Sequence, residues 1–145
     1  MGLTETIRAK ARADRRRIVL PEGDEQRTIA AAEVIRAEGL AEPVLLTPAG
    51  IAADAERRGR YAAALYELRR AKGLTEEGAA KLVSDPMYFG MMMVKEGEAD
   101  GLVSGAVHST GDMLRPALQI IKTAPGMKLV SSSFLMETGN AAGGE

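Results

Sequence analysis

The chain has 145 residues, of which 46% are hydrophobic and 27% charged, as is typical of one soluble globular domain. Lysine plus arginine total 19 and aspartate plus glutamate total 20, so the net charge of -1 gives no attraction to nucleic acid or an anionic membrane. Cysteine is absent and His108 is the single histidine, which excludes disulfides, thiolate nucleophiles and the usual Cys or multi-His metal sites. No apolar run approaches the length of a membrane span, and we expect a cytoplasmic location by default.

The first half of the chain predicts a strand–helix–strand unit. Residues 1–17 are basic and are interpreted as a solvated helix. The apolar run 18–20 stops at a proline and predicts a buried strand, residues 27–38 predict a helix, and residues 43–46 predict a second strand. Short apolar strands alternating with helices predict an α/β fold with an open, mainly parallel sheet and flanking helices.

The second half continues with helices and two more strands. The predicted elements are a helix over 51–71, a helix capped by Thr75, a buried helix over 87–95, a strand over 100–105, a helix over 112–122 and a last strand over 128–136. The run Met91, Met92 and Met93 is interpreted as core filling rather than as an adaptable pocket. We place a domain boundary after residue 127, with an N-terminal α/β domain over 1–127 and the start of a second domain with a glycine-rich tail over 128–145.

The strand over 100–105 is followed by a loop of small residues and a helix start, which is a geometry that binds phosphate. Gly105 lets the backbone approach a ligand, Ser109 and Thr110 supply hydroxyl groups, and Arg115 offers a guanidinium in the following helix. The loop matches neither of the common glycine-rich phosphate-binding motifs.

Each of these residues also has a structural interpretation. Thr110 or Asp112 could serve only as a helix cap, with Arg115 solvated, and the charge of Asp112 opposes anion binding. His108 could act as a general acid or base, but we favour a structural hydrogen bond.

Charged residues elsewhere in the chain carry two further predictions. Glu67 and Arg70 have the spacing of a helical ion pair, which leaves Arg69 without such a partner. Three acids after the first strand, at positions 22, 24 and 25, are expected to solvate a turn and to favour the next helix start.

Several segments together resemble the phosphate acetyl/butyryl transferase family, and phosphate acetyltransferases in particular. The stretch DGLVSGAVHSTGDMLRPALQIIK at 100–122 resembles the family closely, as do IVLPEG at 18–23, YELRRAKG at 66–73, DPMYFG at 85–90 and residues 128–136. The segments occur in order over nearly the whole chain. The resemblance implies a fold similar to isocitrate and isopropylmalate dehydrogenases, here truncated, with the active site in a cleft between two α/β domains.

The family interconverts acetyl-CoA plus phosphate with CoA plus acetyl phosphate, a reaction of acetate metabolism. The resemblance implies that Arg69 and Arg115 bind CoA and phosphoryl groups, and that His108, Ser109 and Thr110 line the same cleft together with Gly105. It implies CoA as a substrate, no tightly bound cofactor, and a homodimer as a possible assembly. The expected mechanism is direct attack of the CoA thiolate on acetyl phosphate.

The chain departs from the family in two respects. Family members are usually more than twice as long, and their aspartate base with its adjacent serine lies in a part with no counterpart here, so we expect no catalytic residue in this chain. The stretch over 47–60 is shorter than in the family and lacks a strand. We therefore expect the N-terminal portion of a phosphate acetyltransferase, inactive alone. The alternatives are a non-catalytic regulatory module that binds acetyl-CoA or an acyl phosphate, and a butyryl-specific transferase.

Overall fold

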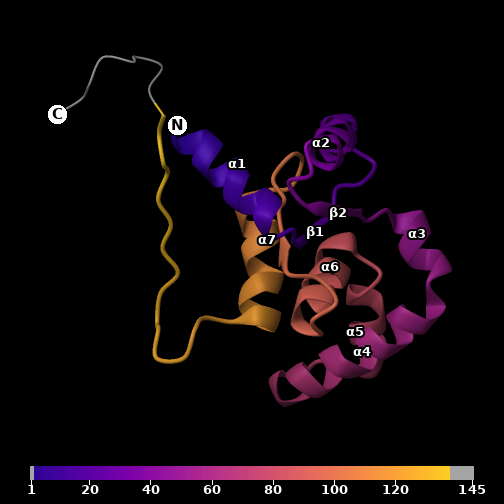
Figure 1. The fold of residues 1–145 in the computed structure, drawn as a ribbon. Coiled ribbons are helices and arrows are strands. Elements are labelled where there is room, and N and C mark those ends of the chain that lie inside the picture. Colours follow the sequence, from indigo (N-terminus) through magenta and orange to yellow (C-terminus); the bar gives the residue numbers. More distant parts are fainter. Residues whose placement is uncertain (1, 138–145) are drawn as a thin grey trace.

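The computed structural model describes residues 2–137 and shows a three-stranded parallel sheet flanked by helices (Figure 1). The strands are β1 (Arg17–Leu20), β2 (Glu42–Leu45) and β3 (Gly101–Leu102), in the order β2-β1-β3. Val19 of the central strand lies beside Val44 on one side and Leu102 on the other. The predicted α/β class with an open parallel sheet is confirmed, although β3 is shorter than the strand expected over 100–105.

Helices make up most of the described residues. They are α1 (Leu3–Ala13), α2 (Gln26–Ala37), α3 (Pro48–Ala53), α4 (Ala55–Arg69), η1 (Arg70–Lys72), α5 (Glu76–Leu82), α6 (Pro86–Lys95), α7 (Thr110–Pro116) and η2 (Ala117–Ile121). Helix α1 buries none of its residues, which agrees with the predicted solvated helix at the start of the chain. None of the helices within residues 2–137 has the length and apolarity to cross a bilayer.

Side-chain caps fix several helix starts where the sequence indicates them. The Thr75 hydroxyl accepts a hydrogen bond from the Gly78 N–H, and the Asp85 carboxylate accepts one from the Met87 N–H. One cap was not anticipated: Asp54 accepts from the Arg57 N–H and starts α4. The single helix predicted over 51–71 is therefore wrong, because Asp54 ends α3 and begins a new helix.

The core lies between the sheet and α6, and continues to α4 on the other side of α6. Met91, Met92 and Met93 of α6 are all buried, which confirms their interpretation as core filling. Tyr61 of α4 meets Phe89 of α6 edge-on, with ring centroids 4.9 Å apart and an interplanar angle of 66°. These contacts hold α4 and α6 together, and α7 and η2 pack against α6.

The helix predicted over 112–122 begins two residues earlier and changes its winding. Helix α7 starts at Thr110 and reaches Pro116, which has no N–H to donate to the preceding turn. The chain then continues as a π-helix, η2, which ends where the Lys122 N–H donates to the Ala117 carbonyl at 2.9 Å. Ile120 of η2 is buried against the core.

The strand predicted over 128–136 is wrong, because this segment is extended but pairs with no strand of the described chain. It runs away from the body of the molecule and returns toward α1 (Figure 1), where Thr4 hydrogen-bonds to Glu137. Phe134 is 93% exposed and Met136 is 80% exposed, so these apolar side chains do not pack against the rest of the described chain. The domain boundary after residue 127 stays a prediction, and the glycine-rich tail over 138–145 lies outside the described residues.

Candidate functional site

The loops that follow β1 and β3 meet at one edge of the sheet because the two strands are parallel neighbours. The Glu22 carboxylate lies at this meeting point and accepts hydrogen bonds from four consecutive backbone N–H groups. The donors are Gly105 at 3.2 Å, Ala106 at 3.0 Å, Val107 at 2.9 Å and His108 at 2.9 Å. The His108 ring Nδ1 also lies 2.8 Å from the carboxylate. An internal carboxylate therefore occupies the loop N–H groups that the sequence suggested for phosphate.

Glu22 is buried rather than solvated, so the expectation of a water-exposed turn is wrong for this residue. Burial raises the pKa of its carboxyl group, but the hydrogen bonds from Val107 and His108, together with that from Ala106, outweigh this and hold the pKa well below its ordinary value. Glu25 does act as expected, because its carboxylate accepts from the Thr28 N–H and starts α2.

The loop also requires glycine at its first position. Gly105 has a φ of 131°, in a region that side-chain-bearing residues rarely adopt. This conformation turns the chain so that the Gly105 N–H and the next three N–H groups point to the same side, toward Glu22. Gly105 therefore contributes to the predicted site by shaping the loop.

Ser109 is the N-cap of α7, a position that the sequence assigned to Thr110 or Asp112. Its hydroxyl accepts from the Asp112 N–H at 3.2 Å, and the Asp112 carboxylate accepts in return from the Ser109 N–H at 3.2 Å and from the Ser109 hydroxyl at 2.7 Å. Thr110 is the first residue of the helix and is exposed. These contacts give Ser109 and Asp112 a structural function at the helix start.

Tyr88 is the described residue that relates the two predicted arginines, which are distant in the sequence. Burial raises the pKa of Tyr88, and the positive charges of Arg115 and Arg69 both act to lower it. Arg69 lines the same cavity as Tyr88, whereas Arg115 is not among the residues that line it. The Tyr88 hydroxyl donates to the Gln119 Oε1 at 2.9 Å. Within residues 2–137 neither arginine has an ion-pair partner, which leaves both charges available to a ligand. Arg70, in contrast, pairs with Glu67 at 3.3 Å as predicted.

A cavity of about 300 Å³ opens between α4, α6 and η2 at this place. Its polar lining comes from Arg69, Lys72, Tyr88 and Gln119. Lys72, Tyr88 and Gln119 were not predicted as site residues. The position of Lys72 in the basic stretch with Arg69 was a signal for it, whereas nothing local marked Tyr88 or Gln119.

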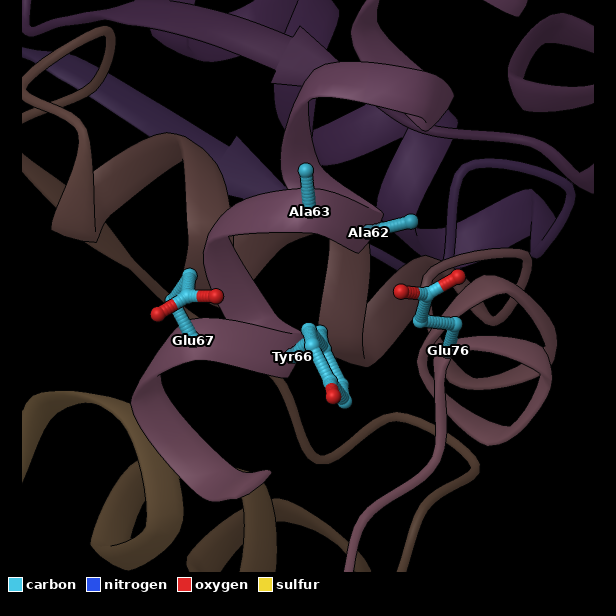
Figure 2. A pocket seen from close by; sticks show the side chains of 5 residues that line it. All are labelled: Ala62, Ala63, Tyr66, Glu67 and Glu76. Atoms are coloured by element: carbon cyan, nitrogen blue, oxygen red, sulfur yellow. The ribbon is translucent and has the colours of Figure 1, made fainter. Parts of the chain in front are cut away.

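A second pocket, of about 410 Å³, lies between α4 and α5 (Figure 2). Its lining includes Tyr66 and two carboxylates, Glu67 from α4 and Glu76 from the start of α5. Two negative charges repel a phosphate-bearing ligand. The pocket beside Arg69 is therefore the better candidate for an anion.

Metal ligands do not gather anywhere in the part of the chain that the structure describes. Residues 2–137 contain no group of three or more His, Asp or Glu side chains that could hold a metal ion. The chemistry available at the candidate site is that of guanidinium, ammonium, hydroxyl and amide groups.

The fold and this basic cavity define an α/β protein with a site suited to an anionic ligand. The chain belongs to the phosphate acetyl/butaryl transferase family, whose sequence model matches residues 2–143. A phosphate acetyltransferase of Thermoanaerobacterium thermosaccharolyticum is 48% identical over 162 aligned positions, which cover 100% of this chain and 49% of that protein. The phosphate acetyltransferase of Escherichia coli is 45% identical over 87% of this chain and 20% of its own length.

Solved structures agree with the sequence comparison. A phosphotransacetylase from Streptococcus pyogenes superimposes with a TM-score of 0.78 and 36% identity, covering 89% of this chain and 46% of that one. The EutD phosphotransacetylase from Staphylococcus aureus gives a TM-score of 0.76 and 36% identity, covering 86% of this chain and 43% of that one. The chain thus spans about half the length of these structures and at most about half of the curated relatives it matches.

Proposed function

We propose that this chain supplies the CoA- and phosphate-binding N-terminal portion of a phosphate acetyltransferase, which interconverts acetyl-CoA plus phosphate with CoA plus acetyl phosphate. The observation that carries the proposal is the basic cavity lined by Arg69, Lys72 and Tyr88, in which Arg69 has no ion-pair partner within the described chain. Guanidinium groups bind phosphate oxygens through paired, charge-assisted hydrogen bonds. CoA serves as a substrate, and no tightly bound cofactor is needed.

The remaining site residues are proposed to line the same cleft. Gly105 and His108 belong to the loop held by Glu22, and Ser109 and Thr110 begin the helix that carries Arg115. Helix α7 therefore joins the loop to Arg115. The arginines are proposed to hold the phosphate groups of CoA.

The reaction itself is a transfer of the acetyl group between sulfur and oxygen. The CoA thiol loses its proton to a base, the thiolate attacks the carbonyl carbon of acetyl phosphate, a C–S bond forms, and the C–O bond to phosphate breaks. Phosphate leaves with the electron pair. This chain contributes binding and orientation, while the base belongs to the family's remaining part.

The purified 145-residue chain should therefore release no detectable CoA from acetyl-CoA and phosphate. The reason is that the chain binds substrates but lacks the acid–base group, which in this direction protonates the departing CoA thiolate. A thiol-trapping assay measures the release directly, with a full-length relative as the positive control. Robust turnover by this chain alone would contradict the proposal that the catalytic base lies elsewhere.

Arg69→Ala and Arg115→Ala should each weaken CoA binding about tenfold or more, because each removes a charge-assisted contact of about 1.5–3 kcal/mol. Isothermal titration calorimetry with CoA gives the dissociation constants. Arg70→Ala is the matched control, since this neighbouring arginine already pairs with Glu67 and should leave the affinity unchanged. If the unsubstituted chain and the three variants bind CoA with equal affinity, neither Arg69 nor Arg115 contributes to the CoA site.

The regulatory-module alternative makes the same binding prediction but differs in the turnover it expects from a reassembled protein. Supplying the remaining half of a relative as a separate chain discriminates the two: restored turnover supports the transferase, and binding without turnover supports the module.

The acetyl-specific enzyme is preferred over a butyryl-specific one because the curated relatives are named phosphate acetyltransferases. A cytoplasmic location and a homodimer are proposed on the family resemblance.

A further inference from the structure

The loop over 105–108 is held from two sides by the segment after β1. On one side the Glu22 carboxylate, whose side chain is 3% exposed, accepts the four backbone N–H groups of the loop. On the other side the Arg27 guanidinium donates to the Ala106 carbonyl at 2.9 Å. Arg27 is itself oriented by Glu25, with 2.7 Å between the guanidinium Nε and the carboxylate.

This loop conformation depends on a negative charge at its centre. Four consecutive N–H groups that point inward form a concave cluster of partial positive charge, which is unfavourable unless an anion or several acceptors fill it. Glu22 supplies both carboxylate oxygens, with two N–H groups bound to each one. An amide in its place has a single acceptor oxygen and would turn N–H donors toward the loop N–H groups.

The loop leads directly into the proposed CoA site. His108 is followed by Ser109, the N-cap of α7, and Arg115 lies in the last turn of this helix rather than in its first. A displacement of the loop therefore displaces the helix start and, with it, the guanidinium near the other end of the helix. Small displacements of a positioned group cost binding energy out of proportion to their size.

We propose that Glu22, assisted by Arg27, is a positioning residue for the CoA site, which holds the loop over 105–108 and thereby fixes the start of α7, the helix that carries Arg115. The proposal rests on the proposed function of that site. Glu22 does not itself touch CoA, since its oxygens are committed to the loop N–H groups.

The test measures CoA affinity by calorimetry for the full 145-residue chain and four variants, Glu22→Gln, Arg27→Ala, Arg115→Ala and Glu98→Gln. The temperature is chosen so that circular dichroism shows every protein folded. Glu98→Gln is the matched control, because this carboxylate bridges Arg57 and Arg60, precedes β3 and has no contact with the loop. Its loss should lower stability and leave CoA affinity unchanged.

Glu22→Gln should weaken CoA binding about tenfold, and Arg27→Ala about threefold because one neutral acceptor contact is lost. Faster hydrogen exchange at the 105–108 amides should accompany both. Binding in Glu22→Gln equal to the unsubstituted chain, while Arg115→Ala is weakened, would overturn the positioning role and leave the proposed function standing. No CoA binding by the unsubstituted chain would overturn both.

If Glu22→Gln does not fold, the Arg27→Ala variant tests the positioning role instead. The Arg27 side chain is 72% exposed, so its removal is not expected to prevent folding. Weakened CoA binding in this variant supports the positioning role, and unchanged binding overturns it.

Discussion

Replacing Gly23 with alanine should lower the free energy of unfolding by about 3 kcal/mol. A Cβ atom at Gly23 would lie 2.4 Å from the Leu46 carbonyl oxygen, far inside normal contact distance, and the atom it meets is backbone. The close approach is built in, because the Gly23 N–H donates to that same oxygen at 2.9 Å and ties the ends of β1 and β2 together. Chemical denaturation monitored by circular dichroism measures the loss.

Gly59→Ala is the matched control and should change stability in the opposite direction. Gly59 lies in the interior of α4, and a Cβ there meets nothing within 4 Å. Alanine should therefore stabilise the helix by about 0.5–1 kcal/mol, because it loses less conformational freedom on folding than glycine. A Gly23→Ala protein as stable as the unsubstituted chain would mean that β1 and β2 do not approach as described.

Glu22→Gln should lower the free energy of unfolding at pH 7 by about 2–3 kcal/mol and change how stability depends on acid. Burial raises the pKa of Glu22, but the hydrogen bonds of Val107 and His108 hold it well below its ordinary value of 4.5 in the folded chain. Between the folded and the ordinary pKa the unfolded chain binds more protons, so stability rises with pH there. The contribution of Glu22 is fully present above pH 4.5 and is lost as the pH falls below it.

Urea unfolding at several pH values between 7 and about 3 checks this expectation. The unsubstituted chain should lose more stability on acidification than Glu22→Gln, and the two curves should converge at low pH. Glu56→Gln is the control, since this side chain is 83% exposed and its loss should change stability by less than about 0.5 kcal/mol. Parallel curves for Glu22→Gln and the unsubstituted chain would contradict the hydrogen-bonded arrangement of Glu22.

Elements whose cause is local could be predicted from the sequence. The strand that ends at Pro21 and the helices that begin at Thr75 and Asp85 have their signals within a few residues, and all three are confirmed. The cap at Asp54 was missed, because it divides a segment whose helical pattern continues on both sides.

Features that depend on a distant partner could not be predicted in this way. Residues 128–136 contain short apolar runs, but a strand forms only beside another strand, and this segment pairs with none of the strands in the described chain. Glu22 looked like a solvated acid because its hydrogen-bond donors lie 83 to 86 residues further along the chain.

The residues of the candidate site also differ in whether the sequence alone could identify them. The family resemblance pointed to Arg69 and Arg115, and the structure places Arg69 with Tyr88 in the lining of one cavity. Tyr88 and Gln119 were missed, since an apolar helix and a proline-containing helix give no local sign that their polar side chains meet at 2.9 Å.

The wide turn of η2 makes the site sensitive to the number of residues as well as to their types. A π-helix closes its hydrogen bond over one residue more than an α-helix. Removing one residue from 117–121 would let the segment wind as an α-helix, in which each residue turns further about the axis than in a π-helix, so the side chains within the segment would change direction. Gln119, which accepts from Tyr88, and Ile120, which is buried in the core, would then lose their present directions. A relative shorter by that one residue could keep every site residue type and still present a different side chain to Tyr88.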